Sequence, residues 1–252
     1  LNIKADIFIP ENTPLQKVKS IEKYKNVNLH KYGNNFNSCL EEAEKYSFIN
    51  NYDFIHPFND YKIIDGQSTV GYEIFQELEP DYIITCVGGG GLISGLIQSS
   101  EEYKTKIIGV EPENADSLNQ ALLYNKVVKL DNIDSFVDGA SVEQIGEIPF
   151  YYCQDYQQDI HVVDKYKLCH EIINLYQNEG IITEPAGALS VTALDQIKDI
   201  EKKTIVCIVS GGNNDLSRYN EMIEYSMQYE NQKHYFLIEF TQNPGEFKKF
   251  VN

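Results

Sequence analysis

A run of four glycines at residues 88–91 is the feature that most constrains the fold of this chain. An apolar stretch, 82–87, precedes the run, and an apolar-periodic stretch, 92–97, follows it. A strand that ends in glycines and turns directly into a helix leaves several backbone N–H groups pointing at one spot, with the positive end of the helix dipole behind them. A flexible linker is the alternative, but strand and helix patterns rarely bracket a linker this tightly. We therefore predict a site for a phosphorylated ligand.

Strand and helix patterns alternate along most of the chain. Runs typical of buried parallel strands occupy residues 82–87, 106–110, 160–163 and 204–209, and shorter strands are expected at 5–9 and 27–30. Helices are expected at 13–21, 38–46, 69–75, 169–177 and 186–196, with an irregular stretch and a weak domain boundary at 53–66. This alternation predicts an α/β fold with mainly parallel sheets.

Composition restricts the partners of the chain. Its 252 residues include 21 Lys+Arg and 38 Asp+Glu, and a net charge of −17 disfavours nucleic acid and anionic membranes as partners. No apolar run reaches the roughly 18 residues of a membrane-spanning helix, and no signal peptide is visible. The five cysteines include no Cys-x-x-Cys pair, which favours free thiols in a reducing cytoplasm over disulfides or zinc. The five histidines are widely spread, and we expect them to have packing roles.

Three polar loops join the glycines at the expected carboxyl ends of strands, where an open α/β sheet binds its ligands. They lie at residues 109–116, 183–188 and 209–215. Each loop alone is ordinary turn chemistry, rich in Asn, Asp, Pro and Gly. Four such loops in one sheet favour a ligand site.

The motifs of these loops, taken in order, resemble one family over nearly the whole chain. The pattern is similar to biosynthetic threonine dehydratase (threonine ammonia-lyase), a fold-type II, tryptophan synthase β-like enzyme of pyridoxal 5'-phosphate. The tail, residues 233–245, resembles the opening of the ACT-like regulatory domain of that enzyme. The matching motifs are Asp65-Gly66-Gln67 with Thr69-Val70-Gly71, the glycine run, Val110-Glu111-Pro112, Phe136-Val137-Asp138-Gly139-Ala140, Gly180-Ile181-Ile182, Glu184-Pro185-Ala186-Gly187-Ala188 and Ser210-Gly211-Gly212-Asn213-Asn214-Asp215.

The resemblance implies three parts of the chain. Residues 1–55 would be the remainder of the small domain, 56–228 the large cofactor-binding domain, and 229–252 the start of the ACT-like domain. We expect a chain clipped at both ends, because a lone strand at 234–240 and one helical turn at 246–250 cannot bury themselves.

The resemblance also implies roles for individual residues in holding pyridoxal 5'-phosphate. Ser210 would place its hydroxyl at the pyridine nitrogen, and Gly139 and Glu184 would line the ring. A neutral hydroxyl leaves that nitrogen largely unprotonated, which suits elimination at the β-carbon better than transamination. The cofactor phosphate would be held by the backbone of Gly88, Gly89, Gly90, Gly91 and Leu92.

The implied reaction is the deamination of L-threonine to 2-oxobutanoate and ammonia, the first step of isoleucine biosynthesis. L-Serine would be a second substrate, isoleucine or valine would be effectors, and the full-length form would be a homotetramer. The Schiff-base lysine of the family and its Ser-Gly-Asn-His loop have no match in this sequence. We therefore assign no catalytic residue and expect the chain alone to be inactive. We also expect no tight metal site, because serine racemase relatives carry a further acid where this chain has Ser117.

Three alternatives stay open. A dinucleotide-binding oxidoreductase would share the glycine-rich turn, with Glu111 as a ribose-binding acid, but Ser94 breaks the Gly-x-Gly-x-x-Gly spacing. A non-catalytic remnant, amino-acid sensor or subunit partner would account for the unmatched lysine. A serine/threonine dehydratase of the catabolic or racemase type would share most of the motifs.

Overall fold

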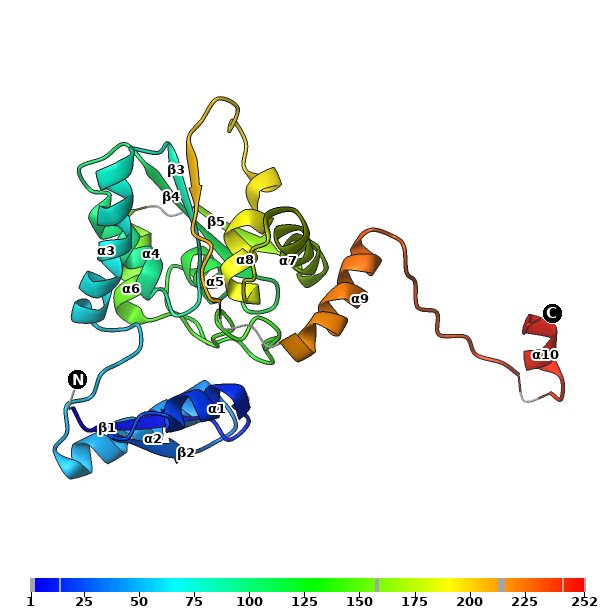
Figure 1. Cartoon of the computed structure of the whole chain (residues 1–252), viewed down its shortest axis with the longest axis horizontal. Coiled ribbons are helices and arrows are strands. Elements are labelled where there is room, and N and C mark those ends of the chain that lie inside the picture. Colours follow the sequence, from blue (N-terminus) through cyan, green and yellow to red (C-terminus); the bar gives the residue numbers. More distant parts are fainter. Residues whose placement is uncertain (1–2, 14, 157–158, 213–215, 242, 252) are drawn as a thin grey trace.

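The structure is a computed structural model that describes residues 3–13, 15–156, 159–212, 216–241 and 243–251. Figure 1 shows a small α/β part lying beside a larger one, and a C-terminal segment that projects away from both. Every strand pair among the described residues is parallel. The prediction of an α/β fold with parallel sheets is confirmed.

The small part consists of two strands and two helices. Strand β1 (Ala5–Ile9) pairs in parallel with β2 (Val27–Lys31), and α1 (Leu15–Glu22) makes the crossover between them. Helix α2 (Phe36–Asn50) follows, and the side chain of Asn35 caps it by accepting a hydrogen bond from the Ser38 backbone N–H at 2.9 Å.

The large part is built on a four-stranded sheet in the order β5-β4-β3-β6. Successive side chains of a strand point to opposite faces, so Ile83 and Ile107 join one buried cluster while Ile84 and Ile108 join another. Both faces are therefore covered, as expected for a parallel sheet. The strands are β3 (Tyr82–Cys86), β4 (Lys106–Pro112), β5 (Asp159–Val163) and β6 (Ile205–Cys207).

Helices cover the two faces of this sheet (Figure 1). The cluster around Ile83 is completed by α3 (Tyr61–Glu77), α4 (Gly91–Ser99), α5 (Ser117–Tyr124) and α6 (Glu147–Asp155). The cluster around Ile84 is completed by α7 (Lys165–Glu179), α8 (Pro185–Thr192) and α9 (Tyr219–Tyr229). Two short 3-10 helices, η1 (Leu194–Gln196) and η2 (Leu216–Arg218), follow α8 and precede α9.

Helix α3 begins earlier than the sequence pattern predicts. It starts at Tyr61, eight residues before Thr69, so the irregular stretch predicted at 53–66 ends at Asp60. The cause is local: Asp60 accepts a hydrogen bond from the Lys62 backbone N–H at 2.7 Å, and the fully buried Ile64 anchors the first turn.

The strand predicted at 234–240 does not form. This segment is extended but pairs with no other strand in the described ranges, and its apolar side chains are exposed. Backbone donors and acceptors that lack a neighbouring strand bond to water, so apolar alternation alone does not make a strand. The expected helical turn is present as α10 (Glu246–Val251).

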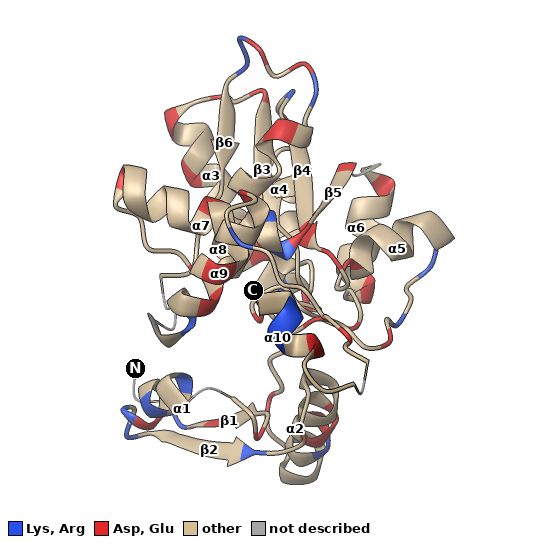
Figure 2. Ribbon diagram, turned by 90° about the vertical axis from the view of Figure 1, so that its right-hand side faces the viewer, with Lys and Arg blue, Asp and Glu red and all other residues tan. Residues whose placement is uncertain are grey.

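The structure shows where the acidic residues, the cysteines and the apolar helices lie. Acidic residues are spread over both parts of the molecule (Figure 2). All five cysteines are free thiols, as predicted. Among the residues that the structure describes, no helix combines the length and the apolar character needed to cross a membrane.

Candidate functional site

The glycine run forms the turn between β3 and α4. Gly90 has a φ of +91° and is the N-cap of α4, a left-handed conformation that glycine adopts without strain. None of the backbone N–H groups from Gly88 to Leu92 has an acceptor among the described residues. These donors lie at the positive end of the α4 dipole, so the turn can accept an anion such as a phosphate monoester.

The glycines also make close contacts that a side chain would prevent. A Cβ on Gly88 would lie 3.1 Å from the Gly139 carbonyl oxygen, and a Cβ on Gly90 would lie 2.5 Å from the Pro149 Cβ. A Cβ on Gly89 would lie 2.1 Å from the ring of Phe58. The turn is therefore fixed by its neighbours, and its shape does not depend on a ligand alone.

Phe58 is a contact residue that the sequence motifs do not indicate. Its ring stacks on Phe36 of the small part, with ring centroids 5.6 Å apart, and meets His56 edge-on at 4.6 Å. His56 Nδ1 accepts hydrogen bonds from the Phe58 and Asn59 backbone N–H groups, at 3.2 and 2.8 Å. Burial lowers the pKa of His56, against a weaker opposite effect of Asp60. The connector between the two parts is thus held against the glycine turn.

Gly139 and Glu184 lie next to each other. A Cβ on Gly139 would lie 3.3 Å from Glu184 Oε1, and a Cβ on Gly211 would lie 2.2 Å from the Glu184 carboxyl carbon. The Glu184 backbone N–H donates to the Gly211 carbonyl oxygen at 2.5 Å. Burial, followed by the charge of Asp138, raises the pKa of Glu184, and Lys17 opposes this shift. Gly139 therefore also connects this carboxylate to the glycine turn, because it touches Gly88.

Ser210 lies beside Cys86, the last residue of β3 before the glycine turn. Its carbonyl oxygen accepts a hydrogen bond from Thr183 Oγ1 at 2.8 Å, and Gly187 approaches so closely that a Cβ there would lie 1.6 Å from this oxygen. The Ser210 side chain is hydrogen-bonded to Cys86, whose pKa is raised by burial and partly lowered by this bond. Cys86 ends β3, so Ser210 lies beside the strand that leads into the glycines. The last three residues of this predicted loop, 213–215, lie outside the described residues.

All eight residues predicted for the cofactor site thus fall around the carboxyl end of β3. Sequence reasoning did not identify Phe58 or Cys86, nor the ion pair of 2.5 Å between Lys17 Nζ and Asp138 Oδ2, which joins α1 to the loop of Gly139. The position of Asp138 inside a matching motif was the available signal for that pair. No sequence pattern links Lys17 to it.

Glu111, near the end of β4, does not present a free carboxylate. Both Glu111 oxygens accept backbone hydrogen bonds at 2.8 Å, one from Leu118 and one from Asn119, at the start of α5. Burial raises the pKa of Glu111 to about 8, and these two hydrogen bonds oppose the shift. The Ser117 hydroxyl is buried without a partner in the described part of the chain. The described residues contain no cluster of three or more His, Cys, Asp or Glu side chains suited to a metal ion.

Comparison with known proteins assigns the chain to a family. Residues 1–211 match the family described as "Pyridoxal-phosphate dependent enzyme". The whole chain aligns with the biosynthetic L-threonine dehydratase IlvA of Halalkalibacterium halodurans at 44% identity and with that of Staphylococcus epidermidis at 45%. The chain spans 62% of the length of each of these relatives.

Solved structures agree with this assignment. The processed form of threonine deaminase isoform 2 from Solanum lycopersicum is 32% identical, with a TM-score of 0.81 over 89% of this chain and 67% of that chain. Maize serine racemase is 27% identical, with a TM-score of 0.79 over 91% of this chain and 72% of that chain. The glycine turn, the parallel α/β fold and the match over residues 1–211 lead to one conclusion: the chain belongs to the pyridoxal-phosphate dependent enzyme family.

Proposed function

We propose that this chain is part of a threonine dehydratase that converts L-threonine to 2-oxobutanoate and ammonia in isoleucine biosynthesis. The observation that carries the proposal is the row of backbone N–H groups from Gly88 to Leu92, beside Ser210, for which the described part of the chain holds no acceptor. The relatives that align over the full chain are named for threonine dehydration, which supports the choice of substrate.

The residues of the site fit pyridoxal phosphate. The N–H groups of Gly88 to Leu92 would donate to the phosphate. The Ser210 hydroxyl would lie at the pyridine nitrogen, while Gly139 and Glu184 would flank the ring. When bound, the cofactor supplies an electron sink for the electron pair released at the substrate α-carbon.

Ser210 sets the character of this sink. A hydroxyl is a neutral partner and leaves the pyridine nitrogen mostly unprotonated, whereas a carboxylate would keep a proton there. The weaker sink favours departure of the β-hydroxyl over competing reactions at the α-carbon. Glu184 carries a pKa raised mainly by burial, so its carboxyl retains its proton to a higher pH than an exposed glutamate. In that form it can donate a hydrogen bond to an oxygen of the bound cofactor.

We assign the Schiff-base lysine to no residue of this sequence. The proposal therefore separates two properties: the 252-residue chain holds the cofactor phosphate, whereas turnover needs a lysine from outside the chain. We further propose that the chain has three parts. Residues 1–55 belong to the small domain, 56–228 form the large domain, and 229–252 begin an ACT-like domain. Binding of isoleucine or valine, a homotetramer and a cytoplasmic location belong to this proposal as well.

The test compares the 252-residue chain with the full-length protein that contains it. We expect the full-length holoenzyme to release 2-oxobutanoate from L-threonine, and pyruvate more slowly from L-serine. The chain alone should bind pyridoxal phosphate without releasing 2-oxobutanoate, and should bind pyridoxal, which lacks the phosphate, at least about tenfold more weakly. Turnover by the chain alone would contradict our assignment of the lysine, and equal binding of pyridoxal would contradict the role of the glycine turn.

Ser210→Ala in the full-length protein tests the second contact. We expect kcat/KM for L-threonine to fall by about tenfold or more, with an altered absorption spectrum of the bound cofactor. Ser47→Ala is the matched control, since Ser47 lies on α2 and its hydroxyl donates only to the Tyr52 carbonyl oxygen. An unchanged spectrum in Ser210→Ala would remove Ser210 from the cofactor site.

A second candidate is serine racemization, favoured by the likeness to maize serine racemase. The two candidates separate by the chirality of the serine that remains after incubation with L-serine. D-Serine formed faster than pyruvate would favour a racemase over a dehydratase.

A further inference from the structure

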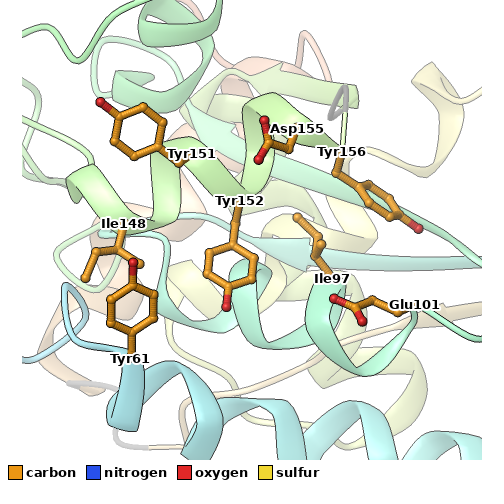
Figure 3. Close-up of a pocket in the computed structure, with 8 residues that line it drawn as sticks. All are labelled: Tyr61, Ile97, Glu101, Ile148, Tyr151, Tyr152, Asp155 and Tyr156. Atoms are coloured by element: carbon orange, nitrogen blue, oxygen red, sulfur yellow. The ribbon is translucent and has the colours of Figure 1, made fainter.

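A pocket of about 440 Å³ lies where α6 meets α3 and α4. Two isoleucines contribute to its lining, and the remaining side chains are aromatic or acidic (Figure 3). These are Tyr61, Tyr151, Tyr152, Tyr156, Glu101 and Asp155. Aromatic ring faces and carboxylates both favour a positively charged ligand.

The tyrosine rings form walls of the pocket. The Tyr156 hydroxyl donates to the Thr105 carbonyl oxygen at 3.1 Å, so that hydroxyl is engaged and the ring remains as a surface. Tyr61 and Tyr151 are 63% and 60% exposed, so their rings are accessible to a ligand. Burial, followed by the charges of Asp65, Tyr61 and Glu101, raises the pKa of Tyr152. The negative faces of such rings attract cations.

Within the described residues, the acidic side chains at the pocket have no partner of opposite charge. Glu101, Asp155 and the neighbouring Asp65 form no ion pair with a Lys, Arg or His in the described ranges. Asp65 accepts only a neutral donor, Gln98 Nε2 at 2.9 Å, and the buried Oε1 of Gln98 has no donor in the same part of the chain. The two carboxylates that line the pocket, Glu101 and Asp155, would therefore gain a partner from a ligand that brings N–H groups and positive charge.

We propose that this pocket binds a small organic cation of the alkylammonium class, with its ammonium group at Glu101 and Asp155 and its aliphatic part against the tyrosine rings. An anion would meet repulsion from both carboxylates. A neutral apolar ligand would remove water from these carboxylates without replacing their hydrogen bonds, which is unfavourable. An alkylammonium ion fits this lining, because both the tyrosine ring faces and the carboxylates attract a positive charge.

The probe for the test is 1,4-diaminobutane, titrated into the full-length protein at low ionic strength and followed by ligand-observed NMR. We expect saturable binding with a Kd of about 1 mM, a value suited to a few exposed cation–π and charge contacts. Neutral 1,4-butanediol and the succinate anion have similar carbon chains and should not bind. No saturation at millimolar amine, or equal binding of the diol, would overturn the proposal.

Variants separate the pocket from the general acidity of the chain. Glu101→Gln and Asp155→Asn should each weaken binding about three- to fivefold, and Tyr61→Ala should weaken it more than Tyr61→Phe, which keeps the ring. Glu102→Gln is the matched control, because it removes the same charge from the adjacent residue, which does not line the pocket. Equal losses in Glu101→Gln and Glu102→Gln would show only diffuse attraction to a chain of net charge −17.

Discussion

The four-stranded sheet and the C-terminal segment contain similar side chains in opposite surroundings. In β3, Ile83 and Ile84 are fully buried, with β4 on one side and β6 on the other. In the segment after α9, Phe236 is 79% exposed and Leu237 is 96% exposed. The difference teaches that an apolar sequence pattern is not sufficient to form a strand. Burial and hydrogen bonding come from adjacent strands and helices, and only the sheet has them.

The most direct test of this comparison is to delete the same number of side-chain carbons in both regions. Ile84→Ala should destabilise the chain by about 4 kcal/mol, because it leaves a cavity between the sheet and α8. Leu237→Ala should change the free energy of unfolding by less than about 0.5 kcal/mol, because that side chain is already in water. Urea denaturation of the 252-residue chain measures both. Similar losses in the two variants would mean that the segment packs against the molecule in solution.

A second experiment compares a tightly packed glycine beside the sheet with a glycine in open surroundings. Gly187→Ala should destabilise the chain by about 3 kcal/mol, since its Cβ would lie 1.6 Å from the Ser210 carbonyl oxygen and the backbone must move. Gly212→Ala adds the same methyl group two residues beyond Ser210, where no described atom apart from its chain neighbours lies within 4 Å of the added Cβ, and should be nearly neutral. The measurement is again urea denaturation, and indistinguishable midpoints for these two variants would contradict the close approach.

The smallest expected effect is on the pH dependence of stability, and it compares Glu111 in β4 with Glu239 in the exposed C-terminal segment. The pKa of Glu111 is raised by burial to about 8 from its ordinary value of 4.5, so the folded chain binds a proton that the unfolded chain releases. Its contribution to stability is therefore present below pH 4.5 and is lost as pH rises toward 8. Between pH 6 and pH 8 the loss should be about 2 kcal/mol.

Glu111→Gln should remove this part of the pH dependence, because an amide does not ionise and can still accept one of the two backbone hydrogen bonds at α5. Glu239→Gln, in the exposed segment, is the control and should leave the pH dependence unchanged. The readout is the free energy of unfolding at pH 6 and pH 8. Parallel curves for the unmodified chain and Glu111→Gln would show that Glu111 ionises normally.

Much of this architecture could be predicted from the sequence. The strands and the glycine turn carry local signals: apolar runs, then consecutive glycines, then a helix period. The order β5-β4-β3-β6 carries no such signal, because pairing of distant strands depends on the whole fold. The start of α3 was missed because Gly66 interrupts an otherwise helical pattern, although Asp60 provided a cap.

The candidate site shows the same division. Ser210, Gly139 and Glu184 could be proposed because the motifs around them resemble those of threonine dehydratase. The loops of Ser210 and Glu184 are also expected at the carboxyl ends of parallel strands, which meet at one edge of the sheet. The contact between Lys17 and Asp138 could not be proposed, since 121 residues separate them and either charge alone is typical of a solvated surface. The ring of Phe58 was missed for a related reason, because an isolated aromatic residue in a connector suggests packing without saying against what.

The contact between Phe58 and Gly89 limits how this part of the sequence can change over evolutionary time. Any side chain at position 89 would need the volume now filled by the ring at position 58, where the gap to a Cβ is 2.1 Å. A large residue at 89 therefore requires a small one at 58, and the reverse exchange restores the fit. The two positions should vary together among relatives, although 31 residues separate them in the chain.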